Sequence, residues 1–364
     1  AGHPVKKTWL AAIKAGEYAT WPGLTYELVS NHLPNTEETA MGHLHRRRQN
    51  IRSTKPKPVQ NTVEDLEPEL QGQAFINKDR TQRVGVHLLG MDELNGMIST
   101  DQTGRFPIKS IKGKSYIMVM YNYDSNVILA TTMKSREAPD LVTAYNELHQ
   151  QLLDGGVKPV LQRLDNEISK VLIKAIKDKG IDYQLASPHD HRLNPAERAI
   201  QTFKNHLIAI LHGCDNKFPA WLWCQIIPQV VMTLNMLRRS RINPKLSAHT
   251  QIFGVFDYNR TPLAPIGTRT VVHARPEQRK TFGDHGVIGW TIGPAMDHYR
   301  HWEFYIPKTR GTRVSDTVVF LPEKYNMPTT SSSDRATAAL EELTEALRNP
   351  AAAKPFLNTG NKLN

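Results

Sequence analysis

The order of short β-rich and helical segments between residues 97 and 186 constrains the fold more than any other feature of this sequence. Three apolar segments come first, each short and punctuated by Gly, Asn or Ser, as in an antiparallel meander, and they cover 97–101, 116–124 and 126–133. A helical repeat of apolar residues at 140–153 follows, ended by Gly155 and Gly156, and a fourth β-rich segment at 160–165 comes next. This β-β-β-α-β order predicts a mixed α/β domain.

Further segments extend this domain toward the C-terminus. A helix is expected at 168–179, a fifth strand at 182–186 and a long helix at 195–211. Helical spacing resumes at 219–239, where Pro228 must kink or break the helix. We therefore expect a mixed five-stranded sheet flanked by helices, within a unit that spans 93–262.

The segments on either side of this unit differ from it in composition. Residues 1–58 show helical spacing and end in a run rich in Lys and Arg, and an acidic linker is expected at 59–92. A small β-barrel is expected at 263–328, because short β-rich segments occur there at 268–273, 286–292, 302–306 and 313–320. Residues 329–364 are mostly poor in large apolar side chains, which predicts a disordered tail with one marginal helix.

Charge and cysteine content narrow the class of partner. The 364 residues include 46 Lys and Arg against 35 Asp and Glu, a formal net charge of +11, which favours a polyanion as partner. The two cysteines, Cys214 and Cys224, exclude a disulfide framework and a zinc site built from paired cysteines, and they fit the cytosol or nucleus. No apolar run reaches the roughly 18 residues that a membrane span needs.

Three carboxylates fall where this topology brings chain segments together. Asp101 ends the first predicted strand, Asp165 ends the fourth, and Glu197 lies in the first turn of the long helix. Functional crevices of open α/β sheets lie at the carboxyl ends of strands, and converging carboxylates repel one another unless hard cations lie between them. The pattern favours a site for two divalent metal ions that act on nucleic-acid phosphates.

Each carboxylate also has a purely structural alternative. Asp101 could form a strand-end turn, Asp165 could begin a helix, and Glu197 could complete a capping box. The long helix is two-faced, however, with an apolar stripe opposite a polar face. That polar face comprises Glu197, Gln201, Lys204 and Asn205. Lys204 lies two turns from Glu197, where it could hold a phosphate near the metal ions, and a merely solvated lysine is the alternative.

Several blocks of the sequence resemble the retroviral-type integrases, specifically those of copia-type (Pseudoviridae-like) retrotransposons with long terminal repeats. The blocks that resemble the catalytic core are STDQTGRFP at 99–107, YIMVMYNYDSNVILA at 116–130, LQRLDNE at 161–167 and SPHDHRLNPAERAIQTFKN at 187–205. Residues 234–259 are similar to the segment after the catalytic helix, and residues 279–320 look like the family's Src-homology-3-like barrel. Together the blocks run from about 99 to 320 in the family's order.

The resemblance implies an RNase H-like core and a metal-binding triad of Asp101, Asp165 and Glu197 that holds two Mg²⁺ ions, with Mn²⁺ as a substitute. It implies a DNA integrase, a polynucleotidyl transferase that joins the 3′-ends of element DNA to target DNA, with endonucleolytic trimming of those ends beforehand if this branch performs it. Lys204 matches a basic position that contacts the element's DNA end.

The resemblance also implies partners and a location. The expected partners are double-stranded DNA, from both the element ends and the target, and further copies of this chain in a homo-oligomer, with no membrane involved. The chain would be part of a Gag-Pol polyprotein, and it would act in the nucleus, reached through a cytoplasmic particle.

Two features depart from the family's pattern. The segment between Asp165 and Glu197 is shorter than in the retroviral enzymes, which a surface loop can tolerate. The family's N-terminal zinc module pairs two His with two Cys, whereas His32, His43 and His45 have no nearby cysteine, so no zinc site is expected. We expect instead a zinc-free helical arm that meets DNA phosphates. The arginines expected to contact DNA are Arg46, Arg47, Arg48 and Arg52 of this arm, and Arg238, Arg239 and Arg241 after a helix.

Two other functions remain open on the sequence alone. One is a DNA-binding remnant of an element that kept the fold and lost catalysis; the presence of all three carboxylates argues against it. The other is an RNase H-like nuclease that cuts without joining, since a fold alone does not decide function. The barrel and the segment after the catalytic helix favour the integrase, because a minimal nuclease would not need them.

Overall fold

The computed structural model describes residues 2–34, 36–44, 96–164, 170–185, 195–274, 277, 279, 282–322, 340 and 343–344. The predictions that lie outside these residues concern the linker at 59–92, most of the tail at 329–364, Asp165, and Arg46, Arg47, Arg48 and Arg52 of the basic arm. Within the described part, no helix has both the length and the apolar character to cross a membrane.

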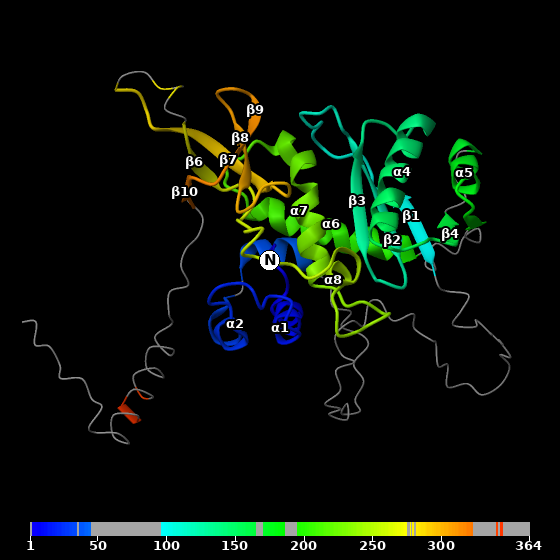
Figure 1. The fold of residues 1–364 in the computed structure, drawn as a ribbon, viewed down its shortest axis with the longest axis horizontal. Coiled ribbons are helices and arrows are strands. Elements are labelled where there is room, and N and C mark those ends of the chain that lie inside the picture. Colours follow the sequence, from blue (N-terminus) through cyan, green and yellow to red (C-terminus); the bar gives the residue numbers. More distant parts are fainter. Residues whose placement is uncertain are drawn as a thin grey trace, which may run out of the picture.

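The five strands predicted between residues 97 and 186 form one mixed sheet (Figure 1). They are β1 (Met97–Gln102), β2 (Tyr116–Asn122), β3 (Ile128–Met133), β4 (Leu161–Leu164) and β5 (Asp182–Leu185). Their order is β3-β2-β1-β4-β5; neighbours among β1, β2 and β3 are antiparallel, whereas β4 runs parallel to β1 and β5 to β4. The predicted meander is confirmed, and the sheet is the mixed five-stranded one that the resemblance implies.

Helices cover both faces of this sheet, and alternate side chains of β2 divide the core in two. Met118 and Met120 pack with α4 (Ala138–Asp154) and α5 (Lys170–Lys177) on one face. Val119 and its neighbours at i±2 pack with α6 (Pro195–Gly213) and α7 (Trp223–Met236) on the other. This alternation follows from the period of two in a β-strand, which points successive side chains to opposite faces of the sheet. Because both faces are covered, the side chains on both faces of β2 are apolar.

The helix predicted at 219–239 is divided, but not at Pro228. A short 3-10 turn, η4 (Ala220–Leu222), precedes α7, and α7 continues through the proline. Ile226, Ile227 and Val230 around it are buried, and burial of that apolar surface offsets the lost backbone hydrogen bond. The chain then enters α8 (Ala248–Phe253), whose first turn is capped by the Ser247 side chain.

A second sheet follows and is antiparallel throughout. Its strands are β6 (Arg269–His273), β7 (Gly286–Pro294), β8 (Trp302–Ile306), β9 (Gly311–Ser315) and β10 (Val318–Leu321), in the order β10-β6-β7-β8-β9. The prediction of a single strand at 313–320 was wrong. Asp316 and Thr317 separate β9 from β10, and these two strands lie at opposite edges of the sheet. Trp290 and Tyr305 join the core of α6 and α7. A closed barrel stays a prediction.

Three helices form an N-terminal module, which we define as the described residues between 2 and 44. They are α1 (Lys6–Lys14), α2 (Tyr26–His32) and α3 (Glu37–His43), and Thr25 and Thr36 cap the second and third with their side chains. Trp9 and Trp21 pack with Met232 and Met236 of α7. The tryptophans therefore fill a small core between the module and α7.

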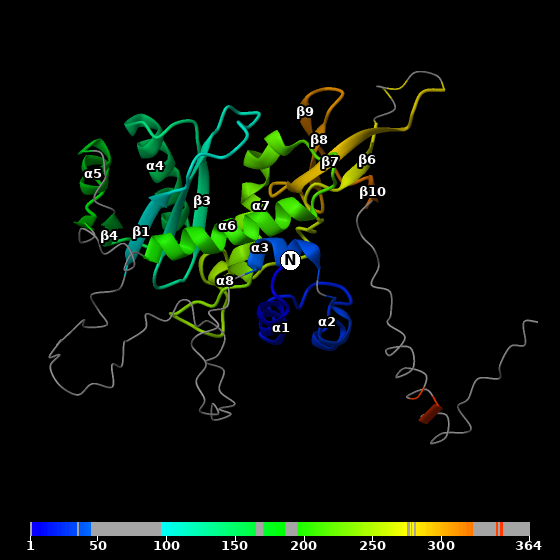
Figure 2. The ribbon, with the colours of Figure 1, turned by 180° about the vertical axis from the view of Figure 1, so that it is seen from behind.

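The module rests on α6 through α3, and Gly42 sets how close the two helices come (Figure 2). A Cβ atom at Gly42 would lie 2.5 Å from the Ala209 Cβ and 2.6 Å from the Asn205 carbonyl oxygen. Neither atom can move away cheaply, because both belong to the interior of a long helix. The close approach also half-buries Asn205, so the polar face predicted for α6 is narrower than its sequence suggested.

Substitution of Gly42 by Ala should loosen the N-terminal module without unfolding the sheet. Overpacking of this kind costs about 1–3 kcal/mol, and the expected result is faster hydrogen exchange of the α3 amides, with unchanged exchange in β1 and β2. Gly104→Ala is the matched control, because nothing lies within 4 Å of a Cβ atom at Gly104. Equal exchange of α3 in both variants would contradict the close-packing explanation.

Candidate active site at the carboxyl end of β1

Asp101 lies near the end of β1 and points toward the α6 face of the sheet. It stands directly opposite Val119 of β2 in the antiparallel register, and opposite residues of such a pair project to the same face. Val119 is wholly buried in the core that contains Ala199 and Phe203 of α6. The Asp101 side chain is half-buried, and its Oδ1 atom accepts a hydrogen bond of 2.6 Å from the Gln102 backbone N–H.

Glu197 lies on the first turn of α6, the helix that covers this same face. α6 begins at Pro195 and contacts both β1 and β2. Its apolar side anchors it, since Ala196, Ala199 and Ile200 are buried while Glu197 is exposed. A carboxylate is favoured there by the partial positive charge of a helix N-terminus. The structure therefore places Asp101 and Glu197 on one side of the sheet.

Asp165 lies outside the described residues, so the structure does not place the third carboxylate. It directly follows β4, whose last residue is Leu164. The parallel register of β4 with β1 sets Ser99 opposite Arg163. Asp101 and Asp165 each follow that pair by two residues in the sequence. Within the described part of the chain, no three His, Cys, Asp or Glu side chains lie where they could hold a metal ion.

Lys204 is exposed on α6, two helical turns beyond Glu197. Gln201 is exposed beside it, whereas Asn205 faces α3. The exposed polar strip of α6 thus runs from Glu197 through Gln201 to Lys204, and a bound polyanion could follow it.

Arg238 does not form the DNA contact that the sequence suggested. Its side chain is buried, and its guanidinium donates hydrogen bonds to the Asn126 carbonyl oxygen at 2.9 Å and to the Asn126 Oδ1 atom at 2.5 Å. Asn126 has a left-handed backbone with φ of 58°. Arg238 therefore holds the turn between β2 and β3, and a guanidinium so enclosed does not reach a phosphate.

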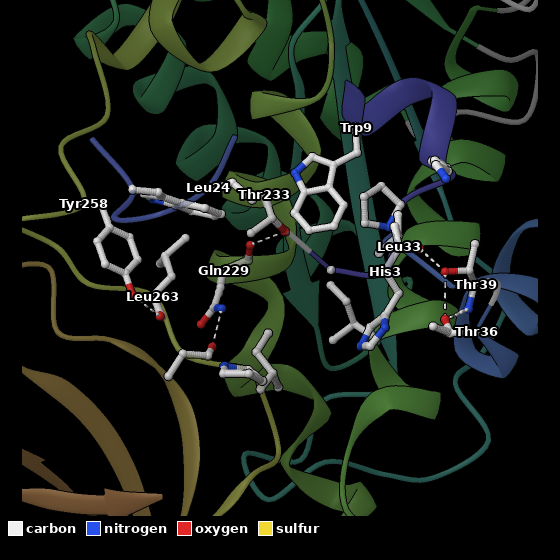
Figure 3. Close-up of a pocket in the computed structure, with 18 of the residues that line it drawn as sticks. His3, Trp9, Leu24, Leu33, Thr36, Thr39, Gln229, Thr233, Tyr258 and Leu263 are labelled. Atoms are coloured by element: carbon white, nitrogen blue, oxygen red, sulfur yellow. Dashed lines mark hydrogen bonds between the residues drawn. The ribbon is translucent and has the colours of Figure 1, made fainter. Parts of the chain in front are cut away.

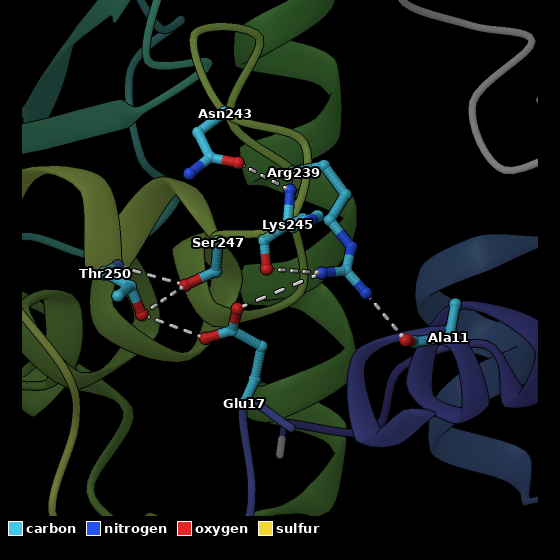
Figure 4. A network of polar contacts seen from close by, with 7 residues as sticks. All are labelled: Ala11, Glu17, Arg239, Asn243, Lys245, Ser247 and Thr250. Atoms are coloured by element: carbon cyan, nitrogen blue, oxygen red, sulfur yellow. Dashed lines mark hydrogen bonds and ion pairs between the residues drawn. The ribbon is translucent and has the colours of Figure 1, made fainter. Parts of the chain in front are cut away.

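Arg239 and Arg241 also have partners inside the protein. Arg239 donates to the Ala11 carbonyl oxygen at 2.8 Å and lies 4.0 Å from a carboxylate oxygen of Glu17, so it ties the N-terminal module to the end of α7 (Figure 4). Arg241 donates to the Tyr121 hydroxyl at 2.6 Å and stacks over the Tyr123 ring at 4.0 Å. Both are half-buried, and their first role is to connect elements of the fold.

A cavity of about 510 Å³ lies between the N-terminal module and α6 and α7 (Figure 3). Its wall is mainly apolar and includes Trp9 and Leu24 of the N-terminal module and Leu263 from the segment after α8. Gln229 donates from Nε2 to the Ala264 carbonyl oxygen at 2.9 Å. Neither Asp101 nor Glu197 lines this cavity, so it is a gap between packed units and not the candidate active site.

A second concave surface lies at the same end of the sheet as Asp101 and was missed in the sequence. Four cations line it: Arg105, Lys109, Lys112 and Lys134. The signal was present as the run IKSIKGK at 108–114, but short basic runs are usually just solvated. Only the tertiary structure shows that Lys134, from the end of β3, lies beside this run.

His206 is a buried titratable group beneath the N-terminal module. Its Nε2 atom lies 2.9 Å from the Thr233 Oγ1 atom, and a Cβ atom at Gly2 would lie 2.6 Å from the ring. The pKa of His206 is lowered to about 3, chiefly by burial and to a smaller extent by the charges of the nearby His43 and His3. His3 itself has a pKa lowered chiefly by burial, with Glu38 opposing that shift.

The stability of the protein should fall as the pH falls below about 6.5, in part through His206. Between that pH and about 3, the unfolded chain binds a proton at this residue that the folded chain excludes, with a slope of about 1.4 kcal/mol per pH unit for one proton. Denaturant unfolding between pH 6 and 4 should therefore show a shallower pH dependence for His206→Gln than for the wild type. The exposed His212→Gln variant should keep the wild-type slope, and a wild-type slope in His206→Gln would refute the assignment.

Comparison with known proteins gives remote structural matches only. No family model matches the sequence, and no curated protein matches it. The catalytic core domain of BIV integrase aligns with 43% of this chain and 93% of its own length, at 16% identity and a TM-score of 0.33. A chain of the simian T-cell lymphotropic virus intasome, solved in complex with PP2A regulatory subunit B56 gamma, aligns with 65% of this chain and 80% of its own, at 13% identity and a TM-score of 0.36. These values transfer neither an activity nor a residue role to this chain.

Proposed function

We propose that this chain is a DNA integrase of the copia-type retrotransposon branch, a metal-dependent polynucleotidyl transferase that joins element DNA 3′-ends to target DNA. The observation that carries the proposal is the register of β1 with β2. It directs Asp101 to the face of the sheet covered by α6, and the first turn of α6 carries Glu197. Asp165 follows β4, the parallel neighbour of β1.

The donor set fits a hard divalent cation. Carboxylate oxygens are the protein ligands that Mg²⁺ takes, usually one or two together with substrate phosphate oxygens and water. Asp101 and Glu197 would supply such oxygens from this chain, and Asp165 is the third candidate. When bound, two Mg²⁺ ions would supply charge stabilisation at the phosphorus and activation of the attacking oxygen.

The remaining residues would bind and orient the DNA. Lys204 on the exposed strip of α6 would hold a phosphate of the element end, two turns from Glu197. The excess of positive charge would favour association with duplex DNA and make it salt-dependent. Joining of two element ends would need more than one copy of the chain. The joining reaction would take place in the nucleus.

The two rival functions differ in what they require of the fold. A nuclease of this fold class needs the mixed sheet and the carboxylates alone. Here the second sheet is packed into the same core as α6, through Trp290 and Tyr305, which favours an enzyme that positions a second DNA segment. A remnant without catalysis would bind DNA and have no metal-dependent activity.

A strand-transfer assay with Mg²⁺ and a duplex of the element's terminal sequence tests the proposal. The wild type should join the 3′-end to a second duplex. Asp101→Asn, Asp165→Asn and Glu197→Gln should each lower joining by at least about a hundredfold, because each removes a charged oxygen ligand, and each should bind duplex DNA with nearly wild-type affinity.

Asp182→Asn and Glu147→Gln are the matched controls, since both carboxylates are exposed and lie on β5 and α4, and neither is among the candidate ligands. They should join DNA as the wild type does. Cutting of the substrate without joining would favour the nuclease, and binding without either reaction would favour the remnant. Substantial joining by any one of the three triad variants would overturn that residue's role.

A further inference from the structure

A basic groove with a volume of about 530 Å³ lies beyond the end of β1, on the side of β2 and β3. We define it by Arg105, Lys109, Lys112 and Lys134, which are all exposed, together with Ser115 and Ser135. No acidic side chain is among the described residues that line it. β2 begins and β3 ends at the same end of the sheet where β1 ends. The groove therefore adjoins the end of the sheet that carries Asp101.

The loop that carries three of these cations has a defined conformation. The Ser110 N–H donates to the Lys114 carbonyl oxygen at 2.9 Å, and the Lys114 N–H donates to the Ser110 Oγ atom at 2.9 Å. At the base of the loop, the Phe106 N–H donates to the Ser115 carbonyl oxygen at 2.7 Å. The backbone of the loop is therefore held by its own hydrogen bonds.

The same loop is anchored to the start of α7. The Trp223 Nε1 atom donates to the Ile108 carbonyl oxygen at 2.8 Å, and the Phe106 ring stacks on Trp223 with 4.3 Å between centroids. The Ile111 N–H donates to the Trp221 carbonyl oxygen at 2.9 Å. Because Trp223 is wholly buried, the cations project from a base that belongs to the core.

The positive charge of the groove is only partly compensated. Asp140 lies beside it: the hydrogen bond from the Ser135 hydroxyl, with the charges of Lys114 and Lys134, holds the pKa of this carboxyl below its usual range. No ion pair joins Arg105, Lys109 or Lys112 to an acid within the described residues. Clustered exposed cations with so little compensation raise the local concentration of a polyanion.

We propose that this groove binds the backbone phosphates of the target DNA. This inference rests on the proposed function and names the partner of that site. Strand transfer brings two DNA molecules to one set of carboxylates, and the two cannot occupy the same surface. Lys204 on α6 is assigned to the element end, so the groove on the β2 and β3 side of Asp101 is the surface left for the second duplex. Phosphate contacts fix the position of a duplex without reading its sequence.

Charge reversal of the two loop lysines tests the groove. The Lys109→Glu/Lys112→Glu variant should bind a duplex of random sequence about tenfold more weakly or worse at 0.1 M salt, and the slope of log affinity against log salt should become shallower by about two, one for each lost phosphate contact. In strand transfer, the KM for target DNA should rise with little change in kcat. The affinity for the element-end duplex should change far less.

The control variant reverses the charge of two lysines at the opposite end of the sheet, Lys158→Glu/Lys179→Glu. Both are exposed and lie just before β4 and β5, so the change in net charge is the same. This control should keep the wild-type salt slope and target KM. The Lys109→Arg/Lys112→Arg variant should bind target DNA as the wild type does, because it retains the charge.

The outcomes separate the groove from the proposed function. Equal losses in the groove variant and the control would overturn the inference, because net charge alone would explain them. An equal loss of element-end and target affinity would overturn the assignment to target DNA. A wild type that does not join DNA would contradict the proposed function, while the binding measurement on a random duplex would still test the groove.

Discussion

The pairing of β1 with its two neighbours is the constraint on which the rest of the structure depends. β1 is antiparallel to β2 and parallel to β4, so its alternate side chains face two different cores. Thr100 faces the α4 side, where its Oγ1 atom accepts a 2.9 Å hydrogen bond from the buried Gln162 side chain of β4. That buried polar pair fixes the β1–β4 register, because any slip would leave both groups unsatisfied in the core. A slip of one residue would also turn Asp101 into the apolar core under α4.

Cations serve two different purposes in this fold, and net charge does not distinguish them. Arg238 is buried against Asn126 and stabilises a strained turn, while Arg239 joins the N-terminal module to the end of α7. These guanidinium groups are engaged in hydrogen bonds inside the protein. The lysines of the basic groove are exposed and only partly compensated. A surface that binds a polyanion is therefore identified by how exposed its cations are and by which partners they have, more than by the number of basic residues.

Local patterns in the sequence predicted the elements well, and long-range contacts account for what it missed. The strands β1 to β5 and the helices α4 and α6 follow from apolar periods of two and 3.6, which each segment carries in itself. Asp101 and Glu197 could be named as candidates because strand ends and helix starts are visible locally. The burial of Arg238, the covering of Asn205 by α3, and the bond from Trp223 to Ile108 join residues far apart in the chain. No local pattern predicts such contacts. The two strands read as one at 313–320 differ only in which distant strand each one pairs with.

The electrostatics of the proposed reaction give the rigid support of the basic loop a physical role. The candidate carboxylates at the carboxyl end of β1 would repel a DNA backbone, and at physiological salt the field of an exposed charge is largely screened beyond about 8 Å. A diffuse positive charge elsewhere on the chain therefore cannot hold DNA at this end; cations close to it are needed. Flexible lysines would lose conformational entropy on binding. Anchoring the loop on Trp221 and Trp223 would remove the backbone part of that loss before DNA arrives. In the proposed reaction, these two tryptophans would therefore help to position a duplex beside the candidate carboxylates.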